Sequence, residues 1–274
     1  MDHKIVNIHV LFYSDWHAKG EPDRSTCLIL DAWDGGDFPG FQKGRIRPLQ
    51  RPELISTPTE TRHYSTEADL LRGFYAMFAE LDPDIITGWN ILGYDLWMTE
   101  RRALALGLAK TCLRIGRMRH RTCQCAAMHF QTGGKGSFGG KKQLAIPGRV
   151  VLDGMFAIQK DFSARLRLAS FSLNSVAEHY LSGNMGNEHA TKDDLPYSKM
   201  RTAFATAAGR HTLASYCMKD TKLTADSVQA MGVVSLYEKI AYFVKTEIHA
   251  VVFKGGRVGR RDFFTFSCAA AARA

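Results

Sequence analysis

A mixed α/β fold is predicted for this chain of 274 residues from three observations. Segments typical of strands alternate with segments typical of helices along the chain. The composition, with 45% hydrophobic and 23% charged residues, is that of a globular protein with a sizeable core. No run of about 18 apolar residues occurs, so we expect no membrane-spanning helix and no membrane partner.

The chain opens with two predicted strands. Residues 4–13 and 26–33 are rich in β-branched and aromatic side chains, and we expect them to pair as a hairpin. Residues 34–62 are interrupted by Gly and Pro, which predicts a long irregular connection between this hairpin and the first helix.

The first helix is predicted to begin with Ser65 or Thr66 as its N-cap. Glu67 and Asp69 would lie in its first turn, where carboxylates favour the helix dipole. Apolar residues then follow at helical spacing until Asp82-Pro83-Asp84 ends the helix. The later elements expected are a buried strand at 85–87, a turn at 88–93, helices at about 94–106, 171–181 and 209–231, and a strand at 150–152.

The net charge of +9 comes mainly from one stretch of the chain. Residues 1–100 carry 9 Lys/Arg and 16 Asp/Glu, whereas residues 101–150 carry 11 Lys/Arg and no acid. Such a local excess is typical of a protein that binds a polyanion such as nucleic acid, and a solvated basic loop is the alternative. Residues 110–148 are also rich in Gly, which predicts a mobile insertion.

The six cysteines are predicted to be free thiols in a reducing compartment. The N-terminus lacks the apolar segment of a secretory signal, and long chains without one seldom depend on disulfides. Cys112, His120, Cys123, Cys125 and His129 raise the question of zinc. A single residue separates Cys123 from Cys125, however, and this is not the spacing of common zinc ligands.

Two segments carry candidate catalytic residues. The turn after the short buried strand presents Asn90, Tyr94 and Asp95, at a position where α/β folds often hold functional groups. Tyr216 and Asp220 lie four residues apart and so share one helix face. Two such carboxylates can hold a hard cation, although a helix-capping Asp95 and a solvent-exposed Asp220 are the simpler interpretations.

The ordered set of motifs resembles the exonuclease domain of family B DNA polymerases. Leu81–Asp95 is similar to the second exonuclease motif of that family, and Tyr216–Asp220 is similar to the third. The agreement runs from residue 1 to about 230 and is closest to delta-type polymerases and their relatives in large DNA viruses. Further segments that fit in order are Glu67–Phe74, Gly148–Asp153, Ser170–His179 and Lys192–Tyr197.

The resemblance implies a 3′–5′ proofreading exonuclease domain with an RNase H-like fold. In that family four acidic residues hold two divalent ions, Mg²⁺ or Mn²⁺, at the scissile phosphate. The resemblance implies that Asp95 and Asp220 are catalytic metal ligands and that Tyr216 orients the attacking water. It also implies that Asn90 and Tyr94 contact the frayed 3′ end of the DNA. Basic residues assigned to the DNA strand are Arg117, Arg119, Arg121, Lys141 and Lys142.

One motif of the family has no counterpart here. Its first motif is an Asp-x-Glu on a strand, and no Asp-x-Glu occurs among the 274 residues. Residues 4–12 already resemble the following strand, so we expect the N-terminal strand and two of four ligands to be missing, as in a gene fragment or split subunit. If the chain is nevertheless active, Asp153 or Asp84 would be the candidates to complete the site.

The expected domains are an exonuclease domain at 1–230 and the start of a linker towards a polymerase domain at 231–274. The expected partners are DNA, as a single-stranded 3′ end or primer-template, and the remainder of the polymerase. The expected place of action is inside the cell, at sites of DNA replication in the nucleus or in an infected host cell. Two other functions stay open: a non-catalytic module that binds DNA or a polymerase, and a stand-alone nuclease whose missing carboxylates come from elsewhere.

Overall fold

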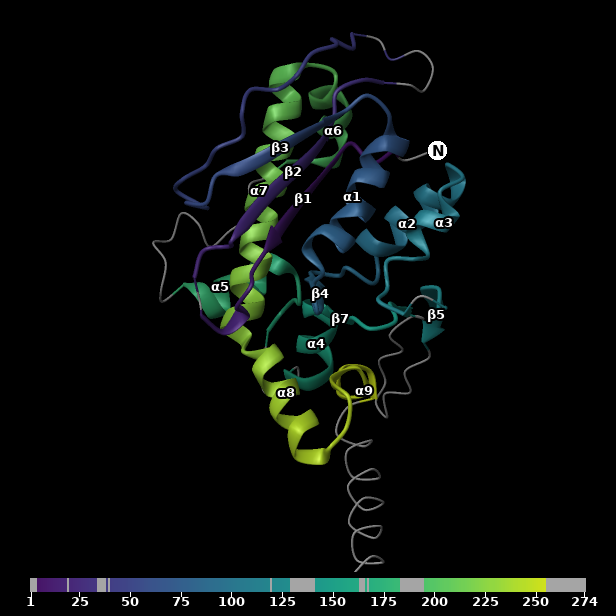
Figure 1. Ribbon diagram of the computed structural model, residues 1–274. Coiled ribbons are helices and arrows are strands. Elements are labelled where there is room, and N and C mark those ends of the chain that lie inside the picture. The colour runs from purple at the N-terminus through teal and green to yellow at the C-terminus, as the bar shows by residue number, and fades with distance from the viewer. Residues whose placement is uncertain are drawn as a thin grey trace, which may run out of the picture.

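The computed structural model has the mixed α/β architecture that the sequence predicts (Figure 1). It describes residues 4–18, 20–33, 38, 40–118, 120–128, 141–162, 166, 168–182 and 195–254, except for the side chains of 124–128, 141–144, 197 and 254. The strands are β1 (Asn7–Phe12), β2 (Arg24–Leu30), β3 (Thr59–Tyr64), β4 (Ile85–Gly88), β5 (Gln124–Met128), β6 (Lys141–Ala145) and β7 (Val150–Asp153). The helices are α1 (Glu67–Leu81), α2 (Asp95–Ala105), α3 (Ala109–Cys112), α4 (Gly154–Ala157), α5 (Leu173–Leu181), α6 (Tyr197–Phe204), α7 (Ala207–Met231), α8 (Val233–Val244) and α9 (Ile248–Lys254), with a 3-10 turn at Trp16–Ala18 and a π-helical turn at Ile158–Phe162.

The first sheet has the order β1-β2-β3. β1 and β2 pair antiparallel, which confirms the predicted hairpin, and β3 pairs parallel with β2. The expectation of irregular chain up to residue 62 is wrong, because β3 begins at Thr59. β3 is an edge strand with mostly polar, half-buried side chains, so it lacks the apolar pattern by which strands are recognised in a sequence.

β2 is buried on both of its faces. Cys27 and Ile29 pack with side chains of α7, whereas Leu28 and Leu30 pack with side chains of α1. Because successive side chains of a strand point to opposite faces, α1 and α7 cover opposite sides of this sheet (Figure 1).

The first helix has the predicted cap. Thr66 accepts a hydrogen bond from the Asp69 backbone N–H (3.1 Å), so Thr66, not Ser65, is the N-cap of α1. The predicted helices at 94–106, 171–181 and 209–231 correspond to α2, α5 and α7 within a few residues.

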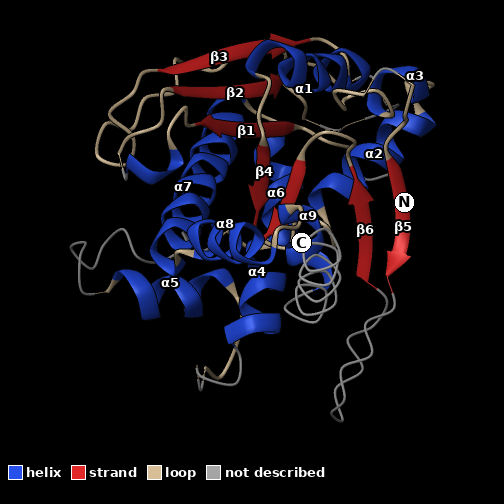
Figure 2. Cartoon of the chain, turned by 60° about the horizontal axis from the view of Figure 1, so that its bottom comes forward, coloured by secondary structure: helices blue, strands red, loops and turns tan. Residues whose placement is uncertain are grey.

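The second sheet brings the predicted strands at 85–87 and 150–152 together as β4 and β7. They run parallel in a register that pairs Gly88 with Asp153, so both strands end at the same edge. α7 packs against β1 and β4, and thus passes this edge of the sheet. In the region of the predicted insertion at 110–148, α3 begins one residue earlier and β5 and β6 form an antiparallel ribbon (Figure 2), while residues 129–140 lie outside the described part.

α8 and α9 pack on the same core as the preceding elements. Val233, Val234 and Val252 belong to the main cluster of buried side chains. Lys160 Nζ donates to the backbone carbonyls of Val251 (3.1 Å) and Val252 (2.7 Å), at the end of α9. The domain boundary expected at residue 230 stays a prediction.

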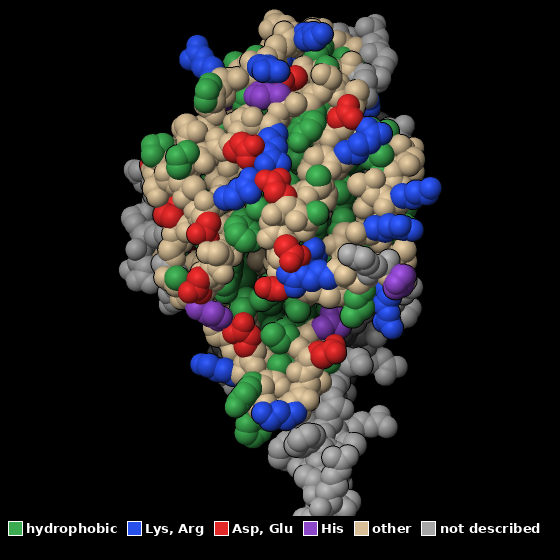
Figure 3. All heavy atoms as spheres, viewed as in Figure 1, with side chains coloured by type: hydrophobic (Ala, Val, Ile, Leu, Met, Phe, Trp, Pro, Cys, Tyr) green, Lys and Arg blue, Asp and Glu red, His purple; other side chains and the backbone are tan. Residues whose placement is uncertain are grey.

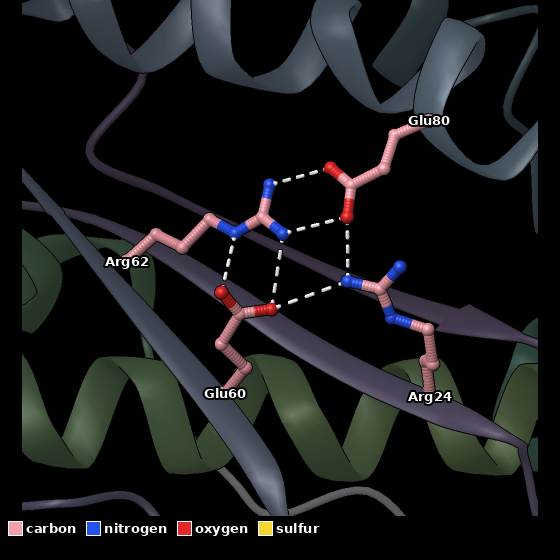
Figure 4. A network of polar contacts seen from close by, with 4 residues as sticks. All are labelled: Arg24, Glu60, Arg62 and Glu80. Atoms are coloured by element: carbon pink, nitrogen blue, oxygen red, sulfur yellow. Dashed lines mark hydrogen bonds and ion pairs between the residues drawn. The ribbon is translucent and has the colours of Figure 1, made fainter.

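A network of ion pairs ties β2, β3 and α1 together on the surface (Figure 4). Arg62 donates to Glu60 (2.8 and 3.0 Å) and to Glu80 (3.0 Å twice), and Arg24 donates to Glu80 (2.6 Å). The hydrogen bonds from Arg62 and then Arg24 lower the pKa of Glu80 to about 2. No helix in the described ranges is long and apolar enough to cross a membrane.

Candidate functional site

The turn between β4 and α2 is held by a buried carboxylate. Asp153, at the end of β7, accepts hydrogen bonds from the backbone N–H groups of Asn90 (3.2 Å) and Leu92 (3.2 Å). The N–H groups of Gly93 and Tyr94 donate in turn to the Asn90 carbonyl (3.0 Å each). Four of the five backbone N–H groups from Asn90 to Tyr94 are thus paired, and the turn has a defined conformation.

Asn90 adopts the left-handed conformation, with φ of 57°. Asn is one of the few residues other than Gly that tolerate it. Its side chain lies over Gly93, because a Cβ atom added at Gly93 would be 2.3 Å from Asn90 Oδ1. Asp95 then begins α2 with an exposed side chain, and Tyr94, at the N-cap, is 48% exposed.

Tyr216 and Asp220 are placed on α7, half-buried and one turn apart. Between them lies Cys217. Burial raises the pKa of the Cys217 thiol to about 12, and the carboxylates of Asp220 and Asp95 both add to this rise. α7, which carries Tyr216 and Asp220, packs against β4, and Asp95 begins the helix after the turn that follows β4, so the two predicted motifs lie in the same part of the molecule.

This pair of carboxylates has the donor chemistry of a magnesium site. Mg²⁺ is commonly held by one or two carboxylates, with water and substrate phosphate at its other positions. The oxygen donors of Asp95 and Asp220 are of the type that Mg²⁺ prefers. Among the described residues no group of three or more His, Cys, Asp or Glu side chains is arranged to hold a metal.

The two residues considered as replacement ligands serve other purposes. Asp153 is 2% exposed and also accepts from the Phe156 backbone N–H (3.1 Å), as the N-cap of α4. Asp84 precedes β4 and so lies at the opposite end of that strand from Asp95, where it forms an ion pair with Arg117. Neither arrangement offers a carboxylate to an ion at Asp95.

The role of Asp153 in the turn is one that the sequence reading missed. The only local signal was an acid placed directly after the apolar run Val150–Leu152 and before a helix, which is typical of an N-cap. Its bonds to Asn90 and Leu92 span more than sixty residues of chain, and no sequence spacing indicates them.

Arg117, predicted to contact DNA, is engaged within the protein. It donates to Asp82 Oδ1 (2.8 Å) and forms an ion pair with Asp84. The hydrogen bonds to Asp82 and then Asp84 raise its pKa above the ordinary value for Arg. The guanidinium therefore has to leave these partners before it binds phosphate.

Two more cations of the basic stretch are structural. Arg149 is buried and donates to the carbonyls of Phe78 (2.9 Å), Pro83 (2.6 Å) and Ile115 (2.9 Å). Arg102 forms a two-pronged ion pair (2.8 and 2.6 Å) with the fully buried Glu67. Both stabilise the fold where the sequence predicted a nucleic-acid surface.

Other cations of the stretch face solvent. Lys110, Arg114 and Arg121 are exposed, and Arg121 is one of the predicted DNA contacts. On the face seen in Figure 3, Lys and Arg side chains are interspersed with Asp and Glu. Of the remaining predicted contacts, Arg119 lies outside the described residues, and Lys141 and Lys142 are described only as backbone of β6.

Comparisons with known proteins agree with this architecture. The family model for the exonuclease domain of DNA polymerase family B matches residues 2–176. The DNA polymerase delta catalytic subunit of Glycine max is 30% identical over 193 residues, which cover 70% of this chain and 16% of that protein. The same subunit of Dictyostelium discoideum is 30% identical over 179 residues (65% and 15%).

A viral relative is similar over a longer stretch. The DNA polymerase catalytic subunit of Epstein-Barr virus (strain B95-8) is 26% identical over 212 residues, which cover 76% of this chain and 19% of the viral protein. The chain thus spans less than a fifth of the length of these curated relatives.

Proposed function

Because the chain belongs to the exonuclease-domain family of the family B DNA polymerases, we propose that it is the 3′–5′ exonuclease portion of such a polymerase. Its mixed sheet with flanking helices is the RNase H-like fold of that domain. The proposed reaction is hydrolysis of 3′-terminal nucleotides of DNA, the proofreading step of replication. The observation that supports it most is the packing of α7, which carries Asp220, against β4, the strand whose following turn leads to Asp95.

Each residue of the proposed site has a different role. Asp95 and Asp220 would hold Mg²⁺ or Mn²⁺, of which the complete family site is expected to contain two. An ion held there would polarise the scissile phosphate. Tyr216 would orient the attacking water, while Asn90 and the exposed ring of Tyr94 would position the terminal nucleotide.

The substrate and partners follow from the same proposal. The substrate would be a single-stranded 3′ end from a primer-template, and the exposed Arg114 and Arg121 are suited to its phosphates. The remainder of the polymerase would deliver that end, at the places where DNA is replicated.

A second function is favoured by one observation. Among the described residues, no cluster of three or more metal-binding side chains surrounds Asp95 and Asp220. A non-catalytic module that binds DNA or a polymerase, and that has lost the first exonuclease motif, would have this property.

Cleavage of a 3′-labelled single strand separates the two functions. The variants are Asp95→Ala, Asp220→Ala and, as the matched control, Asp84→Ala at the opposite end of β4. An exonuclease shortens the strand in a reaction that depends on Mg²⁺, however slowly, and loses this with the first two variants alone. A strand that is bound but never shortened with Mg²⁺ or Mn²⁺, even when the chain is extended by the Asp-x-Glu strand of the family, would favour the non-catalytic module.

A further inference from the structure

We propose that Asp153 is a positioning residue for the site at Asp95 and Asp220. Its carboxylate fixes the turn between β4 and α2, and this turn sets the direction in which Asp95 is presented. Asp153 would neither bind the ion nor touch the substrate. The inference rests on the proposed function, because it gives Asp153 a purpose in ion and substrate binding.

The carboxylate joins three segments of chain. Asp153 Oδ1 accepts from Asn90 N–H (3.2 Å) and Phe156 N–H (3.1 Å), and Oδ2 accepts from Leu92 N–H (3.2 Å). The register of β4 and β7, with Gly88 opposite Asp153, places the carboxylate directly beside the turn. At 2% exposure, water does not compete for these donors.

An ionised carboxylate is suited to this position for a physical reason. Three backbone donors need two acceptor oxygens, and hydrogen bonds to a charged acceptor are stronger than those between neutral groups. The hydrogen bonds to the Asp153 carboxylate offset the free-energy cost of the left-handed conformation of Asn90, whose φ is 57°. An Asn at position 153 would have one acceptor atom and would direct its NH₂ group at a backbone N–H.

The turn has little room to shift. A Cβ atom at Gly88 would be 2.8 Å from Ile91 Cδ1, and one at Gly154 would be 3.0 Å from both the Trp89 ring and Val228. The turn is also continuous with the first turn of α2, because Leu96 N–H donates to the Ile91 carbonyl (2.9 Å). A change at Asp153 is therefore transmitted to Asp95.

Two measurements on the full chain test the proposal. Hydrogen exchange reports on the amides of Asn90 and Leu92, and Mn²⁺ affinity reports on the carboxylate site. The variants are Asp153→Asn and Asp153→Ser, since Asn and Ser both retain an N-cap for α4. Thr206→Ala is the control, because it removes the N-cap bond to Gly209 (3.0 Å) at the far end of the helix that carries Asp220.

We expect both Asp153 variants to exchange the two amides about tenfold faster than the control, and to bind Mn²⁺ about tenfold more weakly. Unchanged exchange, or Mn²⁺ affinity reduced no more than in Thr206→Ala, would overturn the positioning role. If neither variant folds, fast exchange of Asn90 and Leu92 in the unaltered chain would overturn it, and slow exchange would support it. Failure of the proposed function looks different: Mn²⁺ affinity would then be insensitive to Asp95→Asn.

Discussion

His9, on β1, is a buried and neutral side chain. It is 7% exposed, its Nε2 is hydrogen-bonded to Ser25 Oγ (3.0 Å), and burial lowers its pKa to about 3. The unfolded chain binds the proton at an ordinary pKa near 6.5, so protonation favours unfolding. The stability that His9 contributes is full above about pH 6.5 and is lost progressively as the pH falls towards 3.

We therefore predict that the free energy of unfolding falls by about 1.4 kcal/mol per pH unit below pH 6.5 because of His9 alone. Urea unfolding at pH 7.5, 6.5 and 5.5 measures this slope, and His9→Gln serves as the variant without a titrating group. The difference in the free energy of unfolding between the unaltered chain and His9→Gln should shrink as the pH falls. Parallel pH profiles for both proteins would contradict the prediction.

At the scale of single residues, sequence reasoning reaches what is local or carried by a family motif. Tyr216 and Asp220 lie on one helix, and their spacing predicts a shared face. Asp153 and Arg149 each have two backbone partners that lie more than sixty residues away in the chain, and no pattern in the sequence indicates such pairs. This is why the sequence suggested a nucleic-acid surface or a solvated basic loop for the basic stretch, whereas Arg102 and Arg149 stabilise the fold.

At the scale of elements, caps and periodicity predict the helices because both signals lie within one or two turns. α1 illustrates this, since Thr66 and the apolar stripe define it without reference to the rest of the molecule. β3 depends instead on its pairing with β2 and on the network of Arg24, Glu60, Arg62 and Glu80 that holds it to α1. These contacts are long-range, and the polar sequence of β3 hides them.

We predict that Arg62→Gln lowers the free energy of unfolding by about 1 kcal/mol at low salt. The value is modest because the partners Glu60 and Glu80 are 49% and 37% exposed, and water screens the pairs. Denaturant unfolding measures it at low ionic strength and again at about 1 M salt, where the loss should shrink.

Arg72→Gln, on the helix α1 that also carries Glu80, is the matched control. Arg72 pairs only across one turn with Asp69, and both side chains are more than half exposed, so we expect a loss below about 0.5 kcal/mol. Equal losses for the two variants would mean that the network behaves as isolated surface pairs and contributes nothing to the attachment of β3.

At the scale of the whole molecule, positive charge is concentrated in residues 101–150, which is the distribution expected of a chain that binds a polyanion. We predict that the affinity for single-stranded DNA falls steeply as the salt concentration rises. The double variant Arg114→Ala with Arg121→Ala should lower the slope of log binding constant against log salt concentration by about 1.4, or roughly 0.7 per phosphate contact. Fluorescence anisotropy over a salt series measures the slope. Lys239→Ala, exposed on α8 outside the stretch, should leave it unchanged. Affinity that does not change with salt would contradict phosphate contacts.

Activity also depends on the whole molecule, because hydrolysis with two ions needs ligands on both sides of the scissile bond. The proposed site has two carboxylates from this chain, Asp95 and Asp220, and no Asp-x-Glu occurs in the sequence to add another pair. Tyr216 is a poor replacement, because a phenol with an ordinary pKa near 10 is neutral at pH 7 and binds Mg²⁺ weakly. The chain by itself should therefore show little or no exonuclease turnover.

The test compares this chain with a version extended by the Asp-x-Glu strand of the family, on 3′-labelled single-stranded DNA with Mg²⁺. We expect the extension to raise turnover by at least about a hundredfold, since each missing carboxylate weakens both ion binding and the alignment of the attacking water. Replacing both acids of the added strand by Ala is the control, and it should return turnover to the level of the short chain. Rapid Mg²⁺-dependent digestion by the short chain, abolished by Asp95→Ala, would instead mean that other residues of this chain complete the site. Asp153 and Asp84 would not be those residues, because hydrogen bonds from Asn90, Leu92 and Phe156 occupy the first and Arg117 pairs with the second.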